Sequence, residues 1–312
     1  MEADLICGAN FGDEGKGCVA EWLAKNNHYS VAVRTSGSNA GHAGTERDFH
    51  CIPVACLWVP TVYIPAAGVI NLDALYDEAE WAMDRNKGLE VIVSPFAAII
   101  TEAGASSEFG SMGVGVGKTR IAYLQRTATR AIDIKHDLEE HGIMVLEMCF
   151  NELDKVLIEP GQGYGLSLHS KYYPHVTTID LNPYAIAAES EIPFGTDITV
   201  WAISRFHPVR VPSPIGGSSG PMIGELNDFE QVRLGLIEKE TWGDIDGQRK
   251  RICEFDFDLW KSFCKRCRPD KVVFSHFDKF EGSLSEFESK LGCDIDYMSI
   301  KPAEFFPAGK IK

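Results

Sequence analysis

Short apolar segments alternate along the chain with longer segments in which apolar residues recur at helical spacing. The short segments predict strands at residues 5–7, 31–34, 62–64, 96–100, 156–159, 199–205 and 271–275. The longer segments predict helices that include 17–25, 72–86, 138–149 and 256–266. Because strands that alternate with helices favour parallel pairing, we expect an α/β fold. Its core should be a P-loop-like, mostly parallel central sheet flanked by helices.

Long polar segments join several of these elements. The candidate functional loops are residues 35–50, 103–120, 160–180, 206–226 and 240–255. The sequence contains no linker, low-complexity segment or internal repeat, and its 312 residues can form one large core or two. The simplest interpretation is a single domain, 1–312, with long functional loops.

Composition narrows the function classes. The chain is 45% hydrophobic and 24% charged, as in ordinary globular proteins. Its net charge of −15 argues against a nucleic-acid-binding surface, and its apolar runs are too short to span a bilayer. Nine scattered cysteines are typical of a reduced protein, and the lone pair Cys264 and Cys267 has no second pair nearby for a zinc site. We expect a cytoplasmic protein (host cytoplasm if the source is viral) without nucleic-acid or membrane partners.

The opening glycine-rich segment carries the first candidate chemistry. It reads Gly8-Ala-Asn-Phe-Gly-Asp-Glu-Gly-Lys-Gly17, between the first predicted strand and the first predicted helix. Glycines and a helix N-terminus favour phosphate binding, and Lys16 adds a point charge. Cys18 stands near the place where a P-loop has Ser or Thr, so Asp13 becomes the candidate metal ligand or base.

Four further segments combine glycines with polar side chains. Asn39 and His42 close a polar turn after the second predicted strand, and Gln162 follows another strand in Glu159-Pro-Gly-Gln-Gly. The glycine loop 110–117 precedes Lys118 and favours a second anion, although a flexible linker remains the alternative. Residues 247–251 form the densest basic cluster, which a dicarboxylate substrate would require.

At these residues the chain resembles the adenylosuccinate synthetase family. Residues 12–17 match the family's signature loop, and Asn39-Ala-Gly-His42 matches its second signature. Further matches are 49–53, the glycine loop 110–117, 161–163, 173–177 and the basic segment 247–251. The chain resembles the compact forms, and most of all the phage branch that makes 2-aminoadenylosuccinate.

The resemblance implies a C–N bond-forming ligase that joins L-aspartate to a purine nucleoside monophosphate. A nucleoside triphosphate would supply the energy through a 6-phosphoryl intermediate. The implied catalytic residues are Asp13 as the base, His42 as the group that stabilises the transferring phosphoryl group, and Lys16 as the neutralising charge. The implied cofactor is Mg²⁺, held by Asp13 and the carbonyl oxygen of Gly41.

The resemblance also implies binding residues, residue by residue. The triphosphate positions are Gly12, Glu14, Gly15, Gly17, Cys18, Gly41, Ala43, Lys250, His276, Asp278 and Ser299. The monophosphate positions are Asn39, Ala40, Ser111, Met112, Arg126, Gln162, Thr177 and Gln248. The aspartate positions are Asp246, Gly247, Arg249 and Lys250. In the family the arginine at the Arg126 position reaches across a dimer interface, so the resemblance implies a homodimer.

Departures from the family pattern bear on the substrates. Gln248 replaces an arginine near the ribose 2′-OH, which favours a deoxyribonucleotide, and His276 replaces the lysine of the guanine reader, which makes ATP plausible beside GTP. With the short chain and Phe11, these changes favour dGMP as the monophosphate, and Met112 replaces a hydroxyl residue near the substrate phosphate. Asp13, which much of the phage branch lacks, favours the alternative: an ordinary compact enzyme that uses IMP and GTP. Two other classes remain open, a nucleotide-binding regulator on a decayed ligase scaffold and an unrelated P-loop NTPase.

Overall fold

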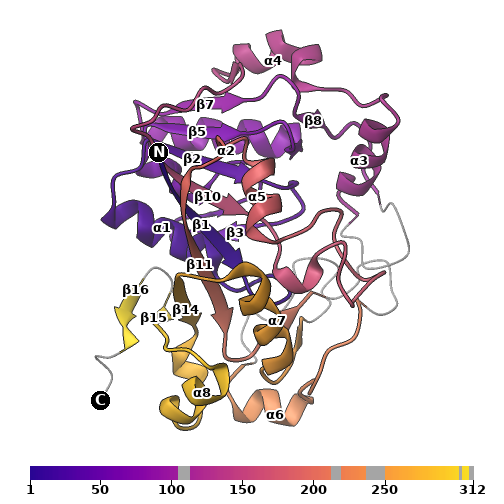
Figure 1. Cartoon of the computed structure of the whole chain (residues 1–312). Helices are drawn as coiled ribbons and strands as arrows, with labels where there is room; N and C mark the ends of the chain where they lie inside the picture. The colour runs from indigo at the N-terminus through magenta and orange to yellow at the C-terminus, as the bar shows by residue number, and fades with distance from the viewer. Residues whose placement is uncertain (105–112, 212–218, 237–249, 302–303, 309–312) are drawn as a thin grey trace.

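A ten-stranded sheet runs through the molecule (Figure 1), which was analysed as a computed structural model describing residues 1–104, 113–211, 219–236, 250–301 and 304–308. The strand order is β16-β15-β14-β11-β1-β10-β2-β5-β7-β9. Neighbouring strands are parallel from β15 to β9, and β16 pairs with β15 in the antiparallel sense. The prediction of a mostly parallel central sheet is confirmed.

The elements have the following bounds. The strands of this sheet are β1 Glu2–Gly8, β2 Val31–Thr35, β5 Thr61–Ile64, β7 Glu90–Val93, β9 Met144–Val145, β10 Lys155–Pro160, β11 Asp197–Arg205, β14 Lys271–Ser275, β15 Tyr297–Lys301 and β16 Glu304–Pro307. Three two-stranded sheets contain β3 His42–Ala43 with β4 Asp48–Phe49, β6 Val69–Ile70 with β8 Ala98–Ile99, and β12 Val209–Arg210 with β13 Arg251–Ile252. The helices are α1 Lys16–Asn26, α2 Leu72–Arg85, α3 Val116–Leu124, α4 Lys135–Glu140, α5 Pro183–Glu189, α6 Asp228–Arg233, α7 Phe257–Cys267 and α8 Leu284–Leu291.

Helices cover both faces of the sheet, because the side chains of its strands alternate between two apolar cores. On β1, Ile6 joins the core with α1, α2 and α4, whereas Leu5 and Cys7 join the core with α5, α7 and α8. Strands buried on both faces read as continuous apolar runs, which is the pattern that the sequence shows.

Capping residues fix where the longer helices begin. Asn71 accepts a hydrogen bond from the backbone N–H of Ala74 at the start of α2. Asp256 accepts from Asp258 and Leu259 at the start of α7. Such caps satisfy donors that have no partner within the helix.

The cysteines form no disulfide bonds. All nine are free thiols, including Cys264 and Cys267 on α7, and Cys267 is buried in the core.

Two predicted elements are wrong. Residues 96–100 do not join the central sheet: only Ala98–Ile99 is extended there, as β8 beside β6, and the sheet instead takes the unpredicted β7. The helix predicted over 138–149 ends at Glu140, because Gly142 adopts a left-handed φ of 73° and Met144–Val145 then pairs with β7 as β9. No helix among the described residues is long and apolar enough to cross a bilayer.

The sheet topology positions the candidate site. Strands β14, β11, β1, β10 and β2 are consecutive and parallel, so their carboxyl ends meet along one edge. The segments that follow them contain the opening loop, the Asn39–His42 turn, Gln162 and His276. Ligands of such sheets bind outside the carboxyl ends of the strands.

Candidate active site

The opening loop between β1 and α1 turns through left-handed backbone conformations. The φ angles are 93° at Gly12, 59° at Asp13 and 87° at Gly15, and α1 starts at Lys16. Aspartate tolerates this region better than most side chains, and glycine adopts it freely. Successive N–H groups in such a turn, followed by a helix N-terminus, form a concave anion site. The predicted phosphate loop therefore has a suitable geometry.

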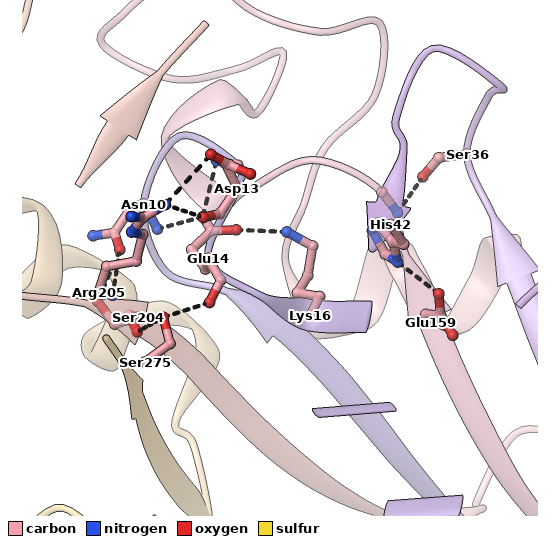
Figure 2. A network of polar contacts seen from close by, with 12 residues as sticks. Asn10, Asp13, Glu14, Lys16, Ser36, His42, Glu159, Ser204, Arg205 and Ser275 are labelled. Carbon is pink, nitrogen blue, oxygen red and sulfur yellow. Dashed lines mark hydrogen bonds and ion pairs between the residues drawn. The ribbon is translucent and has the colours of Figure 1, made fainter. Parts of the chain in front are cut away.

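Glu14 points into the protein rather than toward a ligand. Its buried carboxylate accepts hydrogen bonds from the backbone N–H groups of Asn10 at 3.1 Å and Gly12 at 2.9 Å. The Lys16 ammonium lies 2.5 Å from its Oε2 atom, and Figure 2 shows the lysine pointing toward Glu14. The Glu14 carboxylate therefore stabilises the conformation of the loop. The groups that the loop presents to a ligand are its backbone N–H groups, not the Glu14 side chain.

Asp13 faces the other way and meets two cations. Its side chain is 39% exposed, and its Oδ2 atom lies 3.1 Å from the ammonium of Lys250 and 3.4 Å from Nη1 of Arg205. Lys250 was predicted to bind the triphosphate and aspartate, and the structure brings it to the predicted base. Arg205, the last residue of β11, was not among the predicted site residues.

His42 lies on β3 and is buried between two charged side chains. Its Nδ1 atom lies 2.6 Å from Oε1 of Glu159, and Nη1 of Arg34 lies 2.6 Å from Nδ1 and 3.0 Å from Nε2. Burial and the positive charge of Arg34 lower the pKa of His42 well below its usual value. Burial raises the pKa of Glu159 to about 7. The low pKa favours a neutral imidazole, whose Nδ1 atom shares a hydrogen bond with the Glu159 carboxyl group.

Contacts between the predicted segments bring them to one place. Cys18 Sγ lies 3.7 Å from the carbonyl oxygen of Ala43, which joins α1 to β3. A side chain at Gly163 would lie 2.5 Å from the backbone nitrogen of Gly12 and would also meet Glu14, so only glycine fits there. Ala40 packs in the same way against Gly161. Hence the opening loop, the Asn39–His42 turn and the Gln162 segment, with Gln162 at a φ of 67°, form one surface.

The predicted base-reading segment lies beside the opening loop. Ser275 Oγ donates to the carbonyl oxygen of Glu14 at 2.9 Å, and Nδ1 of His276 lies 2.9 Å from the same Oγ. Burial and the charge of Arg205 lower the pKa of His276 to about 3. Asp278 is partly exposed and pairs with Lys279 at 3.3 Å, while Ser299 is buried on β15.

Other predicted residues lie farther from this surface or outside the described residues. Thr177 is held by a backbone hydrogen bond to the carbonyl oxygen of Leu166. Arg126 is exposed just after α3, and the described contacts do not join it to the other predicted residues. The predicted residues outside the described part of the chain are Ser111, Met112, Asp246, Gly247, Gln248 and Arg249.

Motif reasoning missed three charged side chains of this site: Arg34, Glu159 and Arg205. Their common signal was present in the sequence, because each is the last residue of a strand that the apolar pattern predicts. His50 also lies at this site: a side chain at Gly41 would lie 2.9 Å from Cε1 of His50.

The donor set can be tested against the implied Mg²⁺. Mg²⁺ takes oxygen ligands and usually binds proteins through one or two carboxylates, with water and substrate phosphates completing its shell. Asp13 offers a partly exposed carboxylate and the exposed residue Gly41 offers a carbonyl oxygen, so the chemistry fits. Among the described residues no cluster of three or more His, Cys, Asp or Glu side chains could hold a metal ion by itself.

The amino-acid sequence is similar to those of known proteins. The sequence profile described as adenylosuccinate synthetase matches residues 5–142. The adenylosuccinate synthetase of Methanococcus vannielii is 30% identical, with 97% of each chain covered. The N6-succino-2-amino-2'-deoxyadenylate synthase of Vibrio phage phiVC8 is 26% identical, with 87% of this chain and 84% of the relative covered.

Comparisons of structure give the same fold over nearly the whole chain. The cyanophage S-2L succinoaminodeoxyadenylate synthetase, solved bound to dGMP and dATP as an energy donor, superposes with a TM-score of 0.86 at 21% identity, covering 98% of this chain and 95% of that one. The fully ligated adenylosuccinate synthetase from Plasmodium falciparum superposes with a TM-score of 0.75 at 15% identity, covering 97% and 98%. The predicted fold class and resemblance are confirmed: the chain belongs to the adenylosuccinate synthetase family of C–N bond-forming ligases.

Proposed function

We propose that this protein condenses L-aspartate with dGMP to give N6-succino-2-amino-2'-deoxyadenylate, for the synthesis of DNA that contains 2-aminoadenine. A nucleoside triphosphate drives the reaction through a 6-phosphoryl intermediate. The observation that carries the proposal is the position of Asp13: its exposed carboxylate stands beside a phosphate-binding turn and against Lys250 and Arg205. A base, an anion site and balancing cations therefore lie within one surface.

In this proposal the residues act as follows. Asp13 takes the proton from N1 of the purine, which makes O6 a nucleophile toward the γ-phosphorus. The N–H groups of the opening loop and Lys16 hold the triphosphate, and His42 stabilises the transferring phosphoryl group. Such catalysis depends on positioning and electrostatics. Mg²⁺ held by Asp13 and Gly41 would supply positive charge beside the phosphates. Departure of phosphate from C6 then lets the aspartate amine form the new C–N bond.

The choice of dGMP is supported by similarity along most of the chain to the phage phiVC8 enzyme. The fold neighbour from cyanophage S-2L was solved with dGMP, which agrees with that choice. Gln248 offers no cationic fork to a ribose 2′-OH and so supports a deoxynucleotide. A second candidate is adenylosuccinate synthesis from IMP and GTP, favoured by the 30% identity to the Methanococcus vannielii enzyme and by the retained Asp13.

The hydrogen bonds of His276 support an adenine-type triphosphate. Ser275 has one hydroxyl hydrogen, which it donates to the carbonyl oxygen of Glu14. The carbonyl oxygen of Ser204 also lies 3.4 Å from this hydroxyl, so with the hydrogen directed at a carbonyl oxygen the hydroxyl accepts from Nδ1–H of a neutral His276. Nε2 of His276 is then an acceptor, which suits the amino group of adenine and opposes O6 of guanine. We infer that ATP or dATP is preferred to GTP.

A homodimer is supported by the surface around Arg126. That arginine is exposed after α3, and three apolar neighbours on the helix are also exposed, most of all Leu124 at 82%. The others are Ile121 and Tyr123. An exposed apolar patch of this kind on a helix end fits an interface between two copies of the chain.

Chromatographic analysis of products tests the function directly. The purified protein is incubated with L-aspartate, Mg²⁺ and either dGMP or IMP, with ATP, dATP or GTP as the donor. The proposal expects a succinyl nucleotide from dGMP, faster with ATP or dATP, and no phosphate release when aspartate or the monophosphate is omitted. Turnover of IMP alone selects the second candidate. Triphosphate hydrolysis without the other substrates selects a simple NTPase, and no turnover at all contradicts the ligase.

A further inference from the structure

Arg205 lies beneath the exposed carboxylate of Asp13 and is itself largely covered. Its Nη1 atom donates to the carbonyl oxygen of Asp13 at 3.0 Å and lies 3.4 Å from Oδ2 of the same residue. The Arg205 side chain is 11% exposed, against 39% for Asp13. One planar group thus contacts the backbone and the side chain of the proposed base, while part of the carboxylate stays open to a substrate.

The neighbouring residues of β11 hold a different part of the opening loop. The carbonyl oxygen of Ile203 accepts from the backbone N–H of Ala9 at 2.8 Å, and Ser204 Oγ donates to Oδ1 of Asn10 at 2.8 Å. Figure 2 shows Ser204 and Arg205 beneath the loop with Asn10 and Asp13 above them. The strand end therefore fixes the start of the loop through residues 203 and 204, and Arg205 reaches the turn itself.

The Arg205 side chain contacts Asp13 through one end of its guanidinium group. Its Nε atom is buried and has no hydrogen-bond partner within the described part of the chain. Most buried donors in proteins are paired, so this atom marks Arg205 as a candidate for a role beyond packing.

We propose that Arg205 is the positioning residue of the ligase centre, orienting the Asp13 carboxylate toward the purine through its contacts with the carbonyl oxygen and Oδ2 of Asp13. This inference rests on the proposed function, in which Asp13 takes the N1 proton. A lysine at this position would keep the charge but not the planar group with several donors. Arg205→Lys therefore tests whether the planar guanidinium group, rather than the positive charge alone, is required.

Kinetics of three variants of the full chain test this role. Arg205→Met removes the group, Arg205→Lys keeps its charge, and Ser204→Ala is the matched control that loses a loop contact without touching Asp13. Misplacement of a reacting group by about 1 Å costs on the order of 10²-fold in rate, so we expect Arg205→Met to lower kcat by that factor. The KM values for the monophosphate and triphosphate should stay near those of the wild type. Arg205→Lys should recover little of the lost kcat, and Ser204→Ala should keep it.

Each other outcome overturns the inference. A kcat equal to that of the wild type in Arg205→Met would show that Arg205 does not position Asp13. Full recovery in Arg205→Lys assigns the effect to charge, and a raised KM for the triphosphate at unchanged kcat makes Arg205 a phosphate ligand. A loss in Ser204→Ala equal to that in Arg205→Met assigns it to loop anchoring. If Arg205→Met does not fold, Arg205→Gln replaces it. If the wild type turns over neither dGMP nor IMP, the proposed function fails, and crystal structures of wild type and variant then decide: an unchanged Asp13 rotamer overturns the inference.

Discussion

Nδ1 of His42 lies 2.6 Å from Oε1 of Glu159, and both side chains are buried at the carboxyl end of the sheet. The other carboxylate oxygen of Glu159 accepts from the backbone N–H of Val54 at 3.0 Å. The carboxylate is therefore fixed from two sides and in turn fixes the plane of the imidazole. Partners of this kind set both the tautomer and the orientation of a functional histidine.

Replacement of Glu159 by glutamine should misplace His42. The amide has one acceptor oxygen, so it cannot accept from both His42 and Val54. Second-layer partners of functional histidines typically contribute ~10–100-fold, and we expect kcat to fall by that factor. Steady-state kinetics measure it, and Glu152→Gln, on the exposed surface, is the control. An unchanged kcat in Glu159→Gln would show that His42 is oriented by other contacts.

Replacement of Asp13 by asparagine should remove the base and keep the loop. Asparagine also tolerates the left-handed φ of 59° found here, so the turn should persist. Loss of a general base costs roughly 10²–10⁴-fold in rate. We expect kcat to fall by that factor while the monophosphate still binds, as measured by calorimetry. A regulator on a decayed scaffold would instead keep its function in Asp13→Asn.

Replacement of His276 by asparagine should flatten the pH dependence of stability in mild acid. The folded pKa of about 3 lies below the ordinary value of 6.5, so the unfolded chain binds a proton first as the pH falls. Wild-type stability should therefore decline from pH 6.5 toward pH 3. His42 is present in both proteins, so its contribution cancels. The free energy of unfolding of the variant should therefore fall by about 1.4 kcal/mol less per pH unit in that window than that of the wild type. Urea unfolding at pH 6.5, 5.5 and 4.5 measures the difference, and equal slopes contradict it.

Mixing two inactive variants should restore activity if Arg126 acts across a dimer interface. Arg126→Ala and Asp13→Asn are each inactive alone in this proposal. After subunit exchange, half of the dimers are mixed and contain one intact site, which gives roughly a quarter of wild-type activity. Sedimentation equilibrium of the wild type establishes the dimer independently. A dimer whose mixture stays inactive would place Arg126 in its own subunit's site.

The sequence predicted the central sheet, its apolar strands and the loops that meet at its edge. It predicted Asp13, His42 and Lys250 as site residues from glycine turns that follow strands; in the structure Lys250 contacts Asp13, and His42 packs against Gly17 of the opening loop. The direction of Glu14 was not predictable from its position, because burial depends on Gly163, which is remote in the chain. The helix predicted past Glu140 failed on a single left-handed glycine.

The missed residues share a physical reason. Arg34, Glu159 and Arg205 lie outside the glycine motifs or carry no motif role, yet each ends a predicted strand. In a parallel sheet the last residues of neighbouring strands converge, so a charged residue that ends an apolar run is a candidate for the site. This placement rule finds all three without any motif.

In the structure, Glu14 already occupies the Lys16 ammonium, so a ligand must compete with this buried ion pair. Any anion that recruits the Lys16 ammonium must compete with a carboxylate already 2.5 Å away and shielded from water. A singly charged anion brings no more charge than Glu14 does and gains nothing by displacing it. A polyphosphate brings several charges, together with the backbone donors of the turn. We therefore expect the loop to favour highly charged ligands, whichever base they contain.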